Sequence, residues 1–273
     1  MSTEARNPRS IGLDKMSAKE IVRLMNEEEH AVLRALQSAE DAIAEAAEKA
    51  AEAYGRGGHI VYVGAGTSGR IATMDASEMP PTFGVEKGAF VAALAGGDNA
   101  QASSSENAED DQHEAIQAMN DLKVGPNDIV IGLAASGRTP FVLSAVKHAR
   151  QKGVWTCGIA NNPGTPLLEA VDLPILLDTG PEVLTGSTRL KAGTSQKLVL
   201  NRISTAAMVL SGKVIENLMV DVEPTNQKLK ERCVRIVREL STVSDQQARR
   251  LLDQHSWDVR KVLEIVREPS KTV

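Results

Sequence analysis

Short apolar runs alternate with longer amphipathic stretches through the middle of the chain. An apolar run of about five residues is typical of a strand buried on both faces, whereas apolar residues three and four positions apart indicate a helix. Strands that alternate with helices predict an α/β fold with a mostly parallel sheet and right-handed crossovers. The strands are expected at residues 59–63, 89–95, 128–133, 154–159 and 173–177.

The N-terminal residues follow a different pattern. Residues 1–16 lack helical spacing and predict a loose arm. Ser17 and Glu20 then match a capping box at the start of a helix, and an Ala- and Glu-rich helical pattern continues to Gly55. Such a helix can pack on the sheet or on another subunit, and the sequence does not decide between the two.

The C-terminal residues predict a small helical bundle. A helix ends near Leu210, Pro224 marks a boundary, and three short helices are expected at 226–240, 245–254 and 256–267. The whole chain is therefore predicted to have three parts. These are an N-terminal helical arm over 1–52, an α/β domain over 53–222 and a C-terminal helical bundle over 223–273.

Two glycine-rich loops follow the first and third predicted strands. Glycine lets the backbone approach an anion closely, and the helix after each loop offers free N–H groups and the positive end of its dipole. Ligands of parallel sheets bind beyond the carboxyl ends of the strands, so the two loops indicate a small phosphorylated ligand held from two sides. The first glycine loop is Gly64-Ala65-Gly66-Thr67-Ser68-Gly69-Arg70, and the second is Ala134-Ala135-Ser136-Gly137-Arg138-Thr139-Pro140.

The first glycine loop also matches a dinucleotide-binding fingerprint. Gly64, Gly66 and Gly69 have the required spacing, but the fingerprint needs an acidic residue at the end of the second strand, about 20 residues later. Residues 81–85 are a predicted loop instead, and a dinucleotide does not require the second glycine loop. A sugar phosphate is therefore the favoured ligand.

The polar side chains of the loops have two interpretations each. Ser68, Ser136 and Thr139 are ordinary helix caps, but their presence in two equivalent loops favours contact with a ligand. Arg70 and Arg138 fit bidentate binding of phosphate and a surface salt bridge equally well.

Composition excludes several classes of function. The chain has 273 residues, a net charge of −5 and 3% aromatic residues, which argues against a nucleic-acid or membrane-surface partner. No apolar stretch is long enough to span a bilayer and the N-terminus does not resemble a signal peptide, so a cytoplasmic protein is expected. Cys157 and Cys233 have no metal-site or disulfide spacing and are expected to be buried thiols.

Two glutamates near the loops are candidates for acid–base chemistry. Glu78 precedes Pro80 and Pro81, which are expected to end the helix there, and Glu109 lies where the next helix is expected to begin. Exposure and helix capping are the ordinary explanations for such residues. Spacing and composition alone assign neither glutamate a role, and no histidine is placed to complete a Ser/His/Asp triad.

Three segments of the chain resemble the N-acetylmuramic acid 6-phosphate etherase family. They are residues 63–84, 134–140 and 180–197, and we call the last the signature stretch because the etherases share it with the vertebrate glucokinase regulatory protein. The resemblance covers residues 10–225. Residues 248–259 more loosely resemble a ubiquitin-associated (UBA-like) three-helix bundle.

The resemblance implies a sugar isomerase (SIS) fold, with a five-stranded parallel sheet flanked by helices, and a homodimer without cofactor or metal. It implies a lyase that cleaves the D-lactyl ether of N-acetylmuramic acid 6-phosphate to N-acetylglucosamine 6-phosphate and D-lactate, in cell-wall recycling. The positions that match the family's catalytic residues are Glu78, as acid to the departing lactate, and Glu109, as base at C2. The substrate-binding candidates are Thr67, Ser68, Ser136, Arg138 and Thr139.

An acid at Glu78 must keep its proton near pH 7, which requires burial or a neighbouring carboxylate to raise its pKa. Asp75 is the expected neighbour. Two alternative functions stay open: a non-catalytic sugar-phosphate sensor that acts through a partner protein, and an aldose–ketose isomerase on the same fold. Only the etherase releases lactate.

Overall fold

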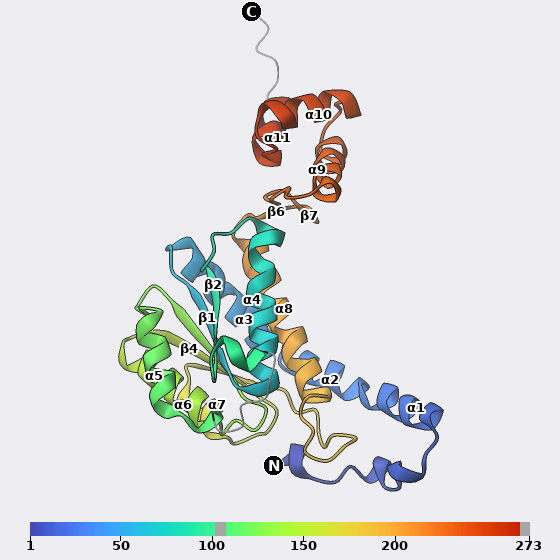
Figure 1. Cartoon of the computed structure of the whole chain (residues 1–273), viewed down its shortest axis with the longest axis vertical. Coiled ribbons are helices and arrows are strands. Elements are labelled where there is room, and N and C mark those ends of the chain that lie inside the picture. Colours follow the sequence, from blue (N-terminus) through green and yellow to red (C-terminus); the bar gives the residue numbers. More distant parts are fainter. Residues whose placement is uncertain (102–107, 268–273) are drawn as a thin grey trace, which may run out of the picture. The chain divides into compact units, whose positions relative to one another are not determined.

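The computed structural model describes residues 1–101 and 108–267, which form two compact units (Figure 1). Unit 1 comprises Met1–Ser77 with Gly88–Ala207, and unit 2 comprises Glu78–Lys87 with Met208–Val273. The division into three parts at residues 52 and 222 stays a prediction. None of the helices in the described ranges is both long and apolar enough to cross a membrane.

Unit 1 is built on a parallel five-stranded sheet in the order β2-β1-β3-β4-β5. The predicted α/β fold and its five strands are confirmed, and no strand end differs by more than one residue from its expected position. The strands are β1 Ile60–Gly64, β2 Phe90–Leu94, β3 Ile129–Leu133, β4 Trp155–Ala160 and β5 Leu173–Leu176.

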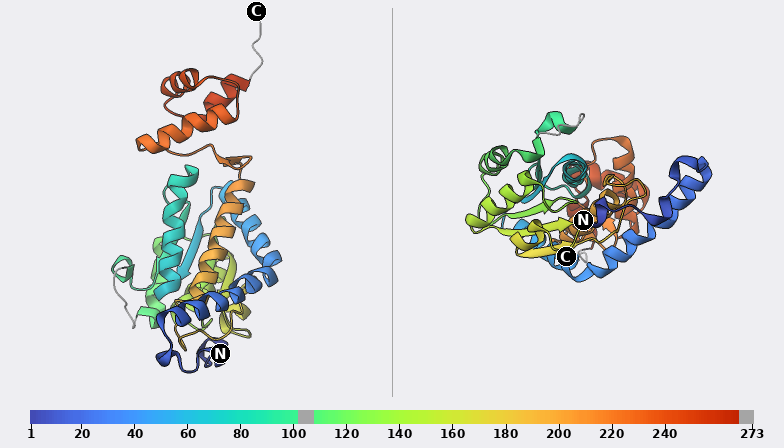
Figure 2. Two further views of the ribbon diagram at one scale, coloured as in Figure 1. Left: turned by 90° about the vertical axis from the view of Figure 1, so that its right-hand side faces the viewer. Right: turned by 90° about the horizontal axis from the view of Figure 1, so that it is seen from below.

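Helices cover both faces of this sheet (Figure 1). Strand β1 shows the arrangement, because successive side chains of a strand point to opposite faces. Val61 and Val63 share a buried cluster with residues of α5, α6 and α7, whereas the hydroxyl of Tyr62 on the other face reaches α4. The helices are α5 Gln112–Asp121, α6 Pro140–Gln151 and α7 Pro166–Ala170 on one face, and α3 Glu40–Gly55, α4 Gly66–Phe83 and α8 Lys191–Leu210 on the other. Figure 2 shows α4 and α8 side by side.

The first residues of the chain are anchored, so the prediction of a loose arm is wrong. Three 3-10 turns, Ser2–Glu4, Pro8–Ser10 and Leu13–Lys15, precede α1 (Ala18–Glu28). Thr3 and Asn7 are 1% and 4% exposed and hydrogen-bond to residues far along the chain. We call residues 1–15 the N-terminal strap. Its anchors are short polar side chains, which an apolar pattern does not register.

The expected capping box begins α1, since Ser17 and Glu20 bond to each other's backbone. The Ala- and Glu-rich pattern forms two helices, α2 His30–Ser38 and α3, which meet at Ala39.

Helix α4 continues through Pro80 and Pro81, so the prediction that these prolines end the helix is wrong. The proline ring fixes φ near the helical value, and what it removes is an N–H donor. Here the loss falls in the last turn, which is closed by the N–H of Gly84 on the carbonyl of Pro80 at 2.9 Å. Gly84 has a φ of +60°, as is usual for the residue after a helix.

Unit 2 contains a small antiparallel pair, β6 Val214–Ile215 and β7 Leu218–Met219, and a bundle of three helices. The helices are α9 Gln227–Glu239, α10 Asp245–Gln254 and α11 Val259–Arg267. The predicted bundle is present, but α11 begins three residues late because Ser256 and Trp257 adopt positive φ values. Both cysteines are buried and unpaired, as expected, and burial raises the pKa of the Cys233 thiol to about 11.

Candidate active site

The two glycine loops lie at neighbouring positions on one edge of the sheet. Strands β1 and β3 pair directly, with Gly64 opposite Leu133, while β2 pairs with the other side of β1. The strand order therefore reverses between β1 and β3. Parallel sheets usually bind their ligands beyond the strand ends at such a reversal.

The first glycine loop is too tight for side chains at its ends. A Cβ at Gly69 would lie 2.6 Å from the carbonyl oxygen of Gly64, so α4 starts almost in contact with the end of β1. Thr67 is half-buried and Ser68 is buried in the first turn of α4. A Cβ at Gly193 would lie 3.3 Å from Cγ2 of Thr67, which places the start of α8 beside this loop.

The second glycine loop carries one local cap. The N–H of Arg138 donates to Oγ of Ser136 at 3.2 Å, whereas Thr139 precedes α6 without a capping hydrogen bond from its side chain. The Arg138 side chain is exposed and makes no ion pair within the described ranges. Nε of Arg70 donates to the carbonyls of Ala100 and Gln101 at 3.1 and 3.2 Å, and its two interpretations stay predictions.

Gly137 sets the shape of the second glycine loop. Its φ is +65°, and a Cβ there would lie 2.2 Å from Oγ1 of Thr165. We expect Gly137→Ala to displace the loop and lower the affinity for inorganic phosphate, with about 1–2 kcal/mol of destabilisation from the left-handed backbone alone. Gly153→Ala is the matched control, because Gly153 has a φ of +75° but open space around it. Phosphate titration and thermal unfolding measure both effects; equal phosphate affinity in the two variants would contradict this role.

The two candidate glutamates lie on different elements. Glu78 is exposed on α4, and Glu109 is exposed in the 3-10 turn Ala108–Asp110, which packs against α6. That turn precedes α5, whose cap is Asp111. The turn that carries Glu109 thus lies against the helix that follows the second glycine loop.

Asp75 is buried inside unit 1. Its carboxylate accepts hydrogen bonds from the Tyr62 hydroxyl at 3.0 Å, Nδ2 of Asn201 at 2.7 Å and Oγ of Ser204 at 3.2 Å. Burial raises the pKa of Asp75 despite these hydrogen bonds. The carboxylate therefore ties α4 to β1 and α8, and the expected contact between Asp75 and Glu78 stays a prediction.

The buried Asp75 carboxylate gives a stability prediction with a definite sign. Folding raises the pKa of Asp75, so the unfolded chain loses this proton at a lower pH than the folded chain does. The free energy of unfolding is therefore highest below the ordinary carboxyl pKa, and it falls as the pH rises through the pKa of the folded protein. Asp75→Asn should remove that slope and keep the three contacts, with Tyr62 turning to accept. Asp75→Ala should cost about 1–3 kcal/mol for each buried donor left unpaired. Urea unfolding at several pH values tests this; an unchanged slope in Asp75→Asn would contradict it.

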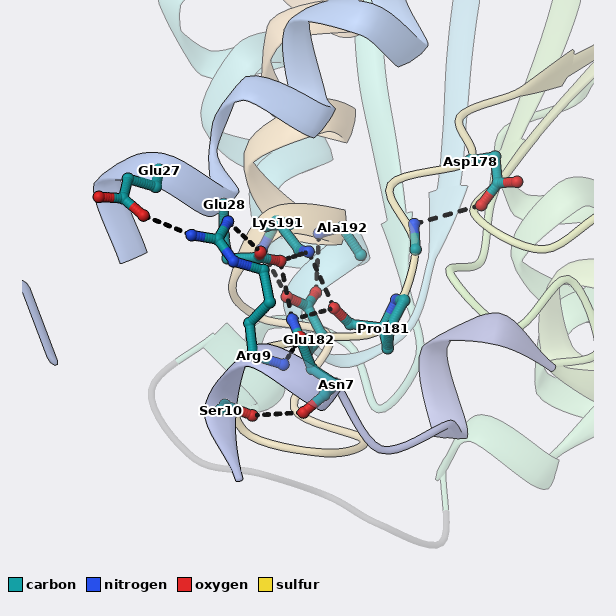
Figure 3. Close-up of polar contacts among 11 residues, drawn as sticks. Asn7, Arg9, Ser10, Glu27, Glu28, Asp178, Pro181, Glu182, Lys191 and Ala192 are labelled. Carbon is teal, nitrogen blue, oxygen red and sulfur yellow. Dashed lines mark hydrogen bonds and ion pairs between the residues drawn. The ribbon is translucent and has the colours of Figure 1, made fainter. Parts of the chain in front are cut away.

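The signature stretch contributes two buried ionic side chains that no sequence pattern singled out (Figure 3). Glu182 accepts the backbone N–H groups of Lys191 and Ala192 at 3.0 and 2.9 Å, so it caps α8. Nζ of Lys191 donates to Glu28 at 2.7 Å and to the carbonyl of Pro181 at 2.8 Å. One signal was available: a lysine in the first turn of a helix opposes the dipole and needs a partner.

No group of three or more His, Cys, Asp or Glu side chains in the described part of the chain could hold a metal ion.

Family models match most of the chain. The N-terminal SIS domain of glucokinase regulatory protein matches residues 22–150, the SIS domain matches residues 107–203, and the C-terminal lid domain of glucokinase regulatory protein matches residues 216–272. These matches agree with the parallel sheet of unit 1 and the helical bundle of unit 2.

Solved structures with this fold include the phosphoheptose isomerases of Francisella tularensis and Neisseria gonorrhoeae. The first has a TM-score of 0.56 and 20% identity and covers 70% of this chain and 98% of that one. The second has a TM-score of 0.53 and 21% identity, with the same coverage. They establish the fold alone.

Curated relatives are much closer in sequence. An N-acetylmuramic acid 6-phosphate etherase of Aeromonas hydrophila is 48% identical over 254 residues, which cover 93% of this chain and 85% of that protein. The N-acetylmuramic acid 6-phosphate etherase of Geobacillus thermodenitrificans is 47% identical over 266 residues, which cover 97% of this chain and 90% of that protein. With an SIS fold, two glycine loops at its strand-order reversal and similarity of this extent, the chain belongs to the N-acetylmuramic acid 6-phosphate etherase family.

Proposed function

We propose that this protein cleaves the D-lactyl ether of N-acetylmuramic acid 6-phosphate, giving N-acetylglucosamine 6-phosphate and D-lactate. The observation that carries the proposal is the 48% identity to a relative of that name over 93% of the chain. The two adjacent glycine loops are the geometric support, because they offer an anion site at the edge of the sheet where ligands bind. We place the reaction in the cytoplasm.

The phosphate group belongs at the two glycine loops in this proposal. Helix N-termini and backbone N–H groups favour a dianion, and hydroxyl donors complete its coordination. The proposed ligands are Thr67 and Ser68 from the first loop, and Ser136, Arg138 and Thr139 from the second. Arg138 suits the role because its guanidinium is exposed and free of ion pairs within the described residues.

The two glutamates supply the proton transfers. In the ring-opened sugar the C1 aldehyde acidifies the C2 hydrogen, which the carboxylate of Glu109 removes. The C3–O bond then breaks, and the carboxylic acid of Glu78 protonates the departing lactate oxygen. Water adds to C3 of the unsaturated aldehyde, and a proton returns to C2. Each positioned acid or base contributes about 10²–10⁴-fold to the rate.

A second copy of the chain completes the site in our proposal. Glu78 follows Ser68 by ten residues on α4, and a helix rises about 1.5 Å per residue, which gives about 15 Å along the axis. A hexose phosphate bound at Ser68 is shorter than that. We therefore propose a homodimer in which Glu78 acts on the substrate held by the glycine loops of the other subunit.

Mixed dimers test this sharing. Glu78→Gln and Arg138→Ala subunits should each be nearly inactive alone. In a mixed dimer one site regains intact loops and an intact Glu78, so lactate release should return to about a quarter of the wild-type rate, given random pairing and one restored site in each mixed dimer. No recovery in dimers isolated with two different affinity tags would exclude the shared site.

Lactate release from N-acetylmuramic acid 6-phosphate by the purified protein tests the function itself. Stoichiometric D-lactate and N-acetylglucosamine 6-phosphate would support the etherase. Binding of the sugar phosphate without lactate would favour a sensor, and interconversion of aldose and ketose phosphates without lactate would favour an isomerase.

A further inference from the structure

A buried asparagine after β4 joins the N-terminal strap to the second glycine loop. Asn162 is 1% exposed, and its side-chain amide uses four hydrogen-bonding positions. Oδ1 accepts the N–H of Thr3 at 3.2 Å and the hydroxyl of Ser2 at 3.1 Å. Nδ2 donates to Oγ1 of Thr3 at 2.9 Å and to the carbonyl of Ala135 at 2.8 Å. A buried amide satisfied on every side holds its partners in one arrangement.

The Ala135 carbonyl is held by two donors. The backbone N–H of Asn161 also reaches it, at 3.0 Å, so both lone pairs of this oxygen are engaged. A trans peptide is planar, and the next N–H points opposite to the carbonyl. No peptide bond between described residues is cis. Fixing the Ala135 carbonyl toward Asn161 and Asn162 therefore aims the N–H of Ser136 in the opposite direction.

The N–H of Ser136 is a donor without a partner among the described residues. Its neighbours in the loop are engaged, since Gly137 donates to the carbonyl of Ala134 at 2.8 Å and Arg138 donates to Oγ of Ser136. Backbone donors rarely stay unpaired unless water or a ligand accepts from them. Ser136 is half-buried and so is not enclosed in the core.

We propose that Asn162 is a positioning residue of the sugar-phosphate site: it holds the Ala135–Ser136 peptide so that the Ser136 N–H donates to the phosphate, with Thr3 as its support. This inference rests on the proposed function, because it takes the second glycine loop as the phosphate site. Thr3 also fixes the signature stretch, since its carbonyl accepts the N–H of Gly186 at 3.2 Å. Thr3, rather than the strap as a whole, thereby links Asn162 to the signature stretch.

The test replaces Asn162 by leucine, which has the same branching and adds no charge beside the anion. We expect Asn162→Leu to weaken binding of inorganic phosphate, measured by calorimetry, by about ten- to hundredfold, the value of one hydrogen bond to a charged group. The KM for the sugar phosphate should rise by the same factor with little change in kcat, because phosphate contacts are made equally in the ground and transition states.

Two further variants separate positioning from general loosening. Asn7→Leu also releases the strap, from Glu28 and Pro181, but leaves Asn162 intact, so it should lower stability without weakening phosphate binding. Thr3→Val removes one partner of Asn162 and should weaken phosphate binding by a smaller factor, which Thr3→Ser should restore. Thr3→Val decides the question if Asn162→Leu does not fold.

The proposal would be overturned if folded Asn162→Leu bound phosphate as tightly as the wild type does. If Asn162→Leu does not fold, wild-type phosphate affinity in Thr3→Val would overturn it instead. Equal weakening in Asn7→Leu would also overturn it, because the effect would then reflect the strap as a whole. If the wild type binds phosphate but releases no lactate, the etherase function fails while the calorimetry still tests Asn162.

Discussion

Glu109→Gln should abolish both lactate release and exchange of the C2 hydrogen with solvent, whereas Glu78→Gln should abolish lactate release alone. The base acts first, so without it no carbanion forms at C2. The acid acts on the leaving oxygen, so without it the C2 proton still comes and goes. Each loss should be about 10²–10⁴-fold. Deuterium incorporation from heavy water, followed by NMR, measures exchange in the same samples that are assayed for lactate.

The matched control is Asp110→Asn, which removes an exposed carboxylate next to Glu109 in the same 3-10 turn. It should retain both activities. Continued C2 exchange in Glu109→Gln would assign the base elsewhere. Wild-type lactate release in Glu78→Gln would remove the acid role from Glu78.

The sheet and the glycine loops were predictable because their causes are local in sequence. Each strand is a short apolar run, and the tight turns after β1 and β3 require glycine at positions such as Gly69 and Gly137. Parallel pairing then brings the two loops to one edge without further information. The register of Gly64 with Leu133 confirms that adjacency.

The contacts of the strap and of the signature stretch were not predictable, because the partner residues are distant in sequence. Thr3 is buried by hydrogen bonds to Asn162, 159 residues away, and Lys191 is buried by an ion pair with Glu28, 163 residues away. Neither produces a periodic apolar pattern. The candidate roles of Glu78 and Glu109 likewise came from resemblance, since both are exposed and their spacing alone fits helix termini.

Removing Glu28 from its ion pair with Lys191 should lower the free energy of unfolding much more than removing Lys191. Lys191 is 3% exposed, and without Glu28 its ammonium keeps one hydrogen bond among the described residues, to the carbonyl of Pro181, while Glu182 and Glu29 act on it electrostatically without a hydrogen bond. Glu28→Leu should therefore destabilise unit 1 by about 3–5 kcal/mol, the usual cost of a buried charge that loses its partner. Lys191→Met should cost less, because the Glu28 carboxylate keeps Asn7 at 2.7 Å and Arg9 at 2.9 Å.

The pH dependence of this pair has the opposite sign to that of Asp75. Burial raises the pKa of Glu28, but hydrogen bonds from Lys191 and Asn7 outweigh it and hold the pKa below its ordinary range. The stabilisation from ionised Glu28 is therefore complete above the ordinary carboxyl pKa, and it is lost as pH falls through the folded value. In Glu28→Leu the free energy of unfolding should no longer fall with pH in this acidic range.

Tryptophan fluorescence reports each unit separately, because the chain's two tryptophans lie in different units, Trp155 in β4 and Trp257 after α10. In a Trp257→Phe background, urea unfolding followed at Trp155 gives the free energy of unfolding of unit 1.

The double variant Glu28→Leu with Lys191→Met should be more stable than Glu28→Leu alone, since no buried charge is left unpaired. If Glu28→Leu and Lys191→Met lowered the free energy of unfolding equally, the carbonyl of Pro181 alone would suffice to hold the Lys191 ammonium.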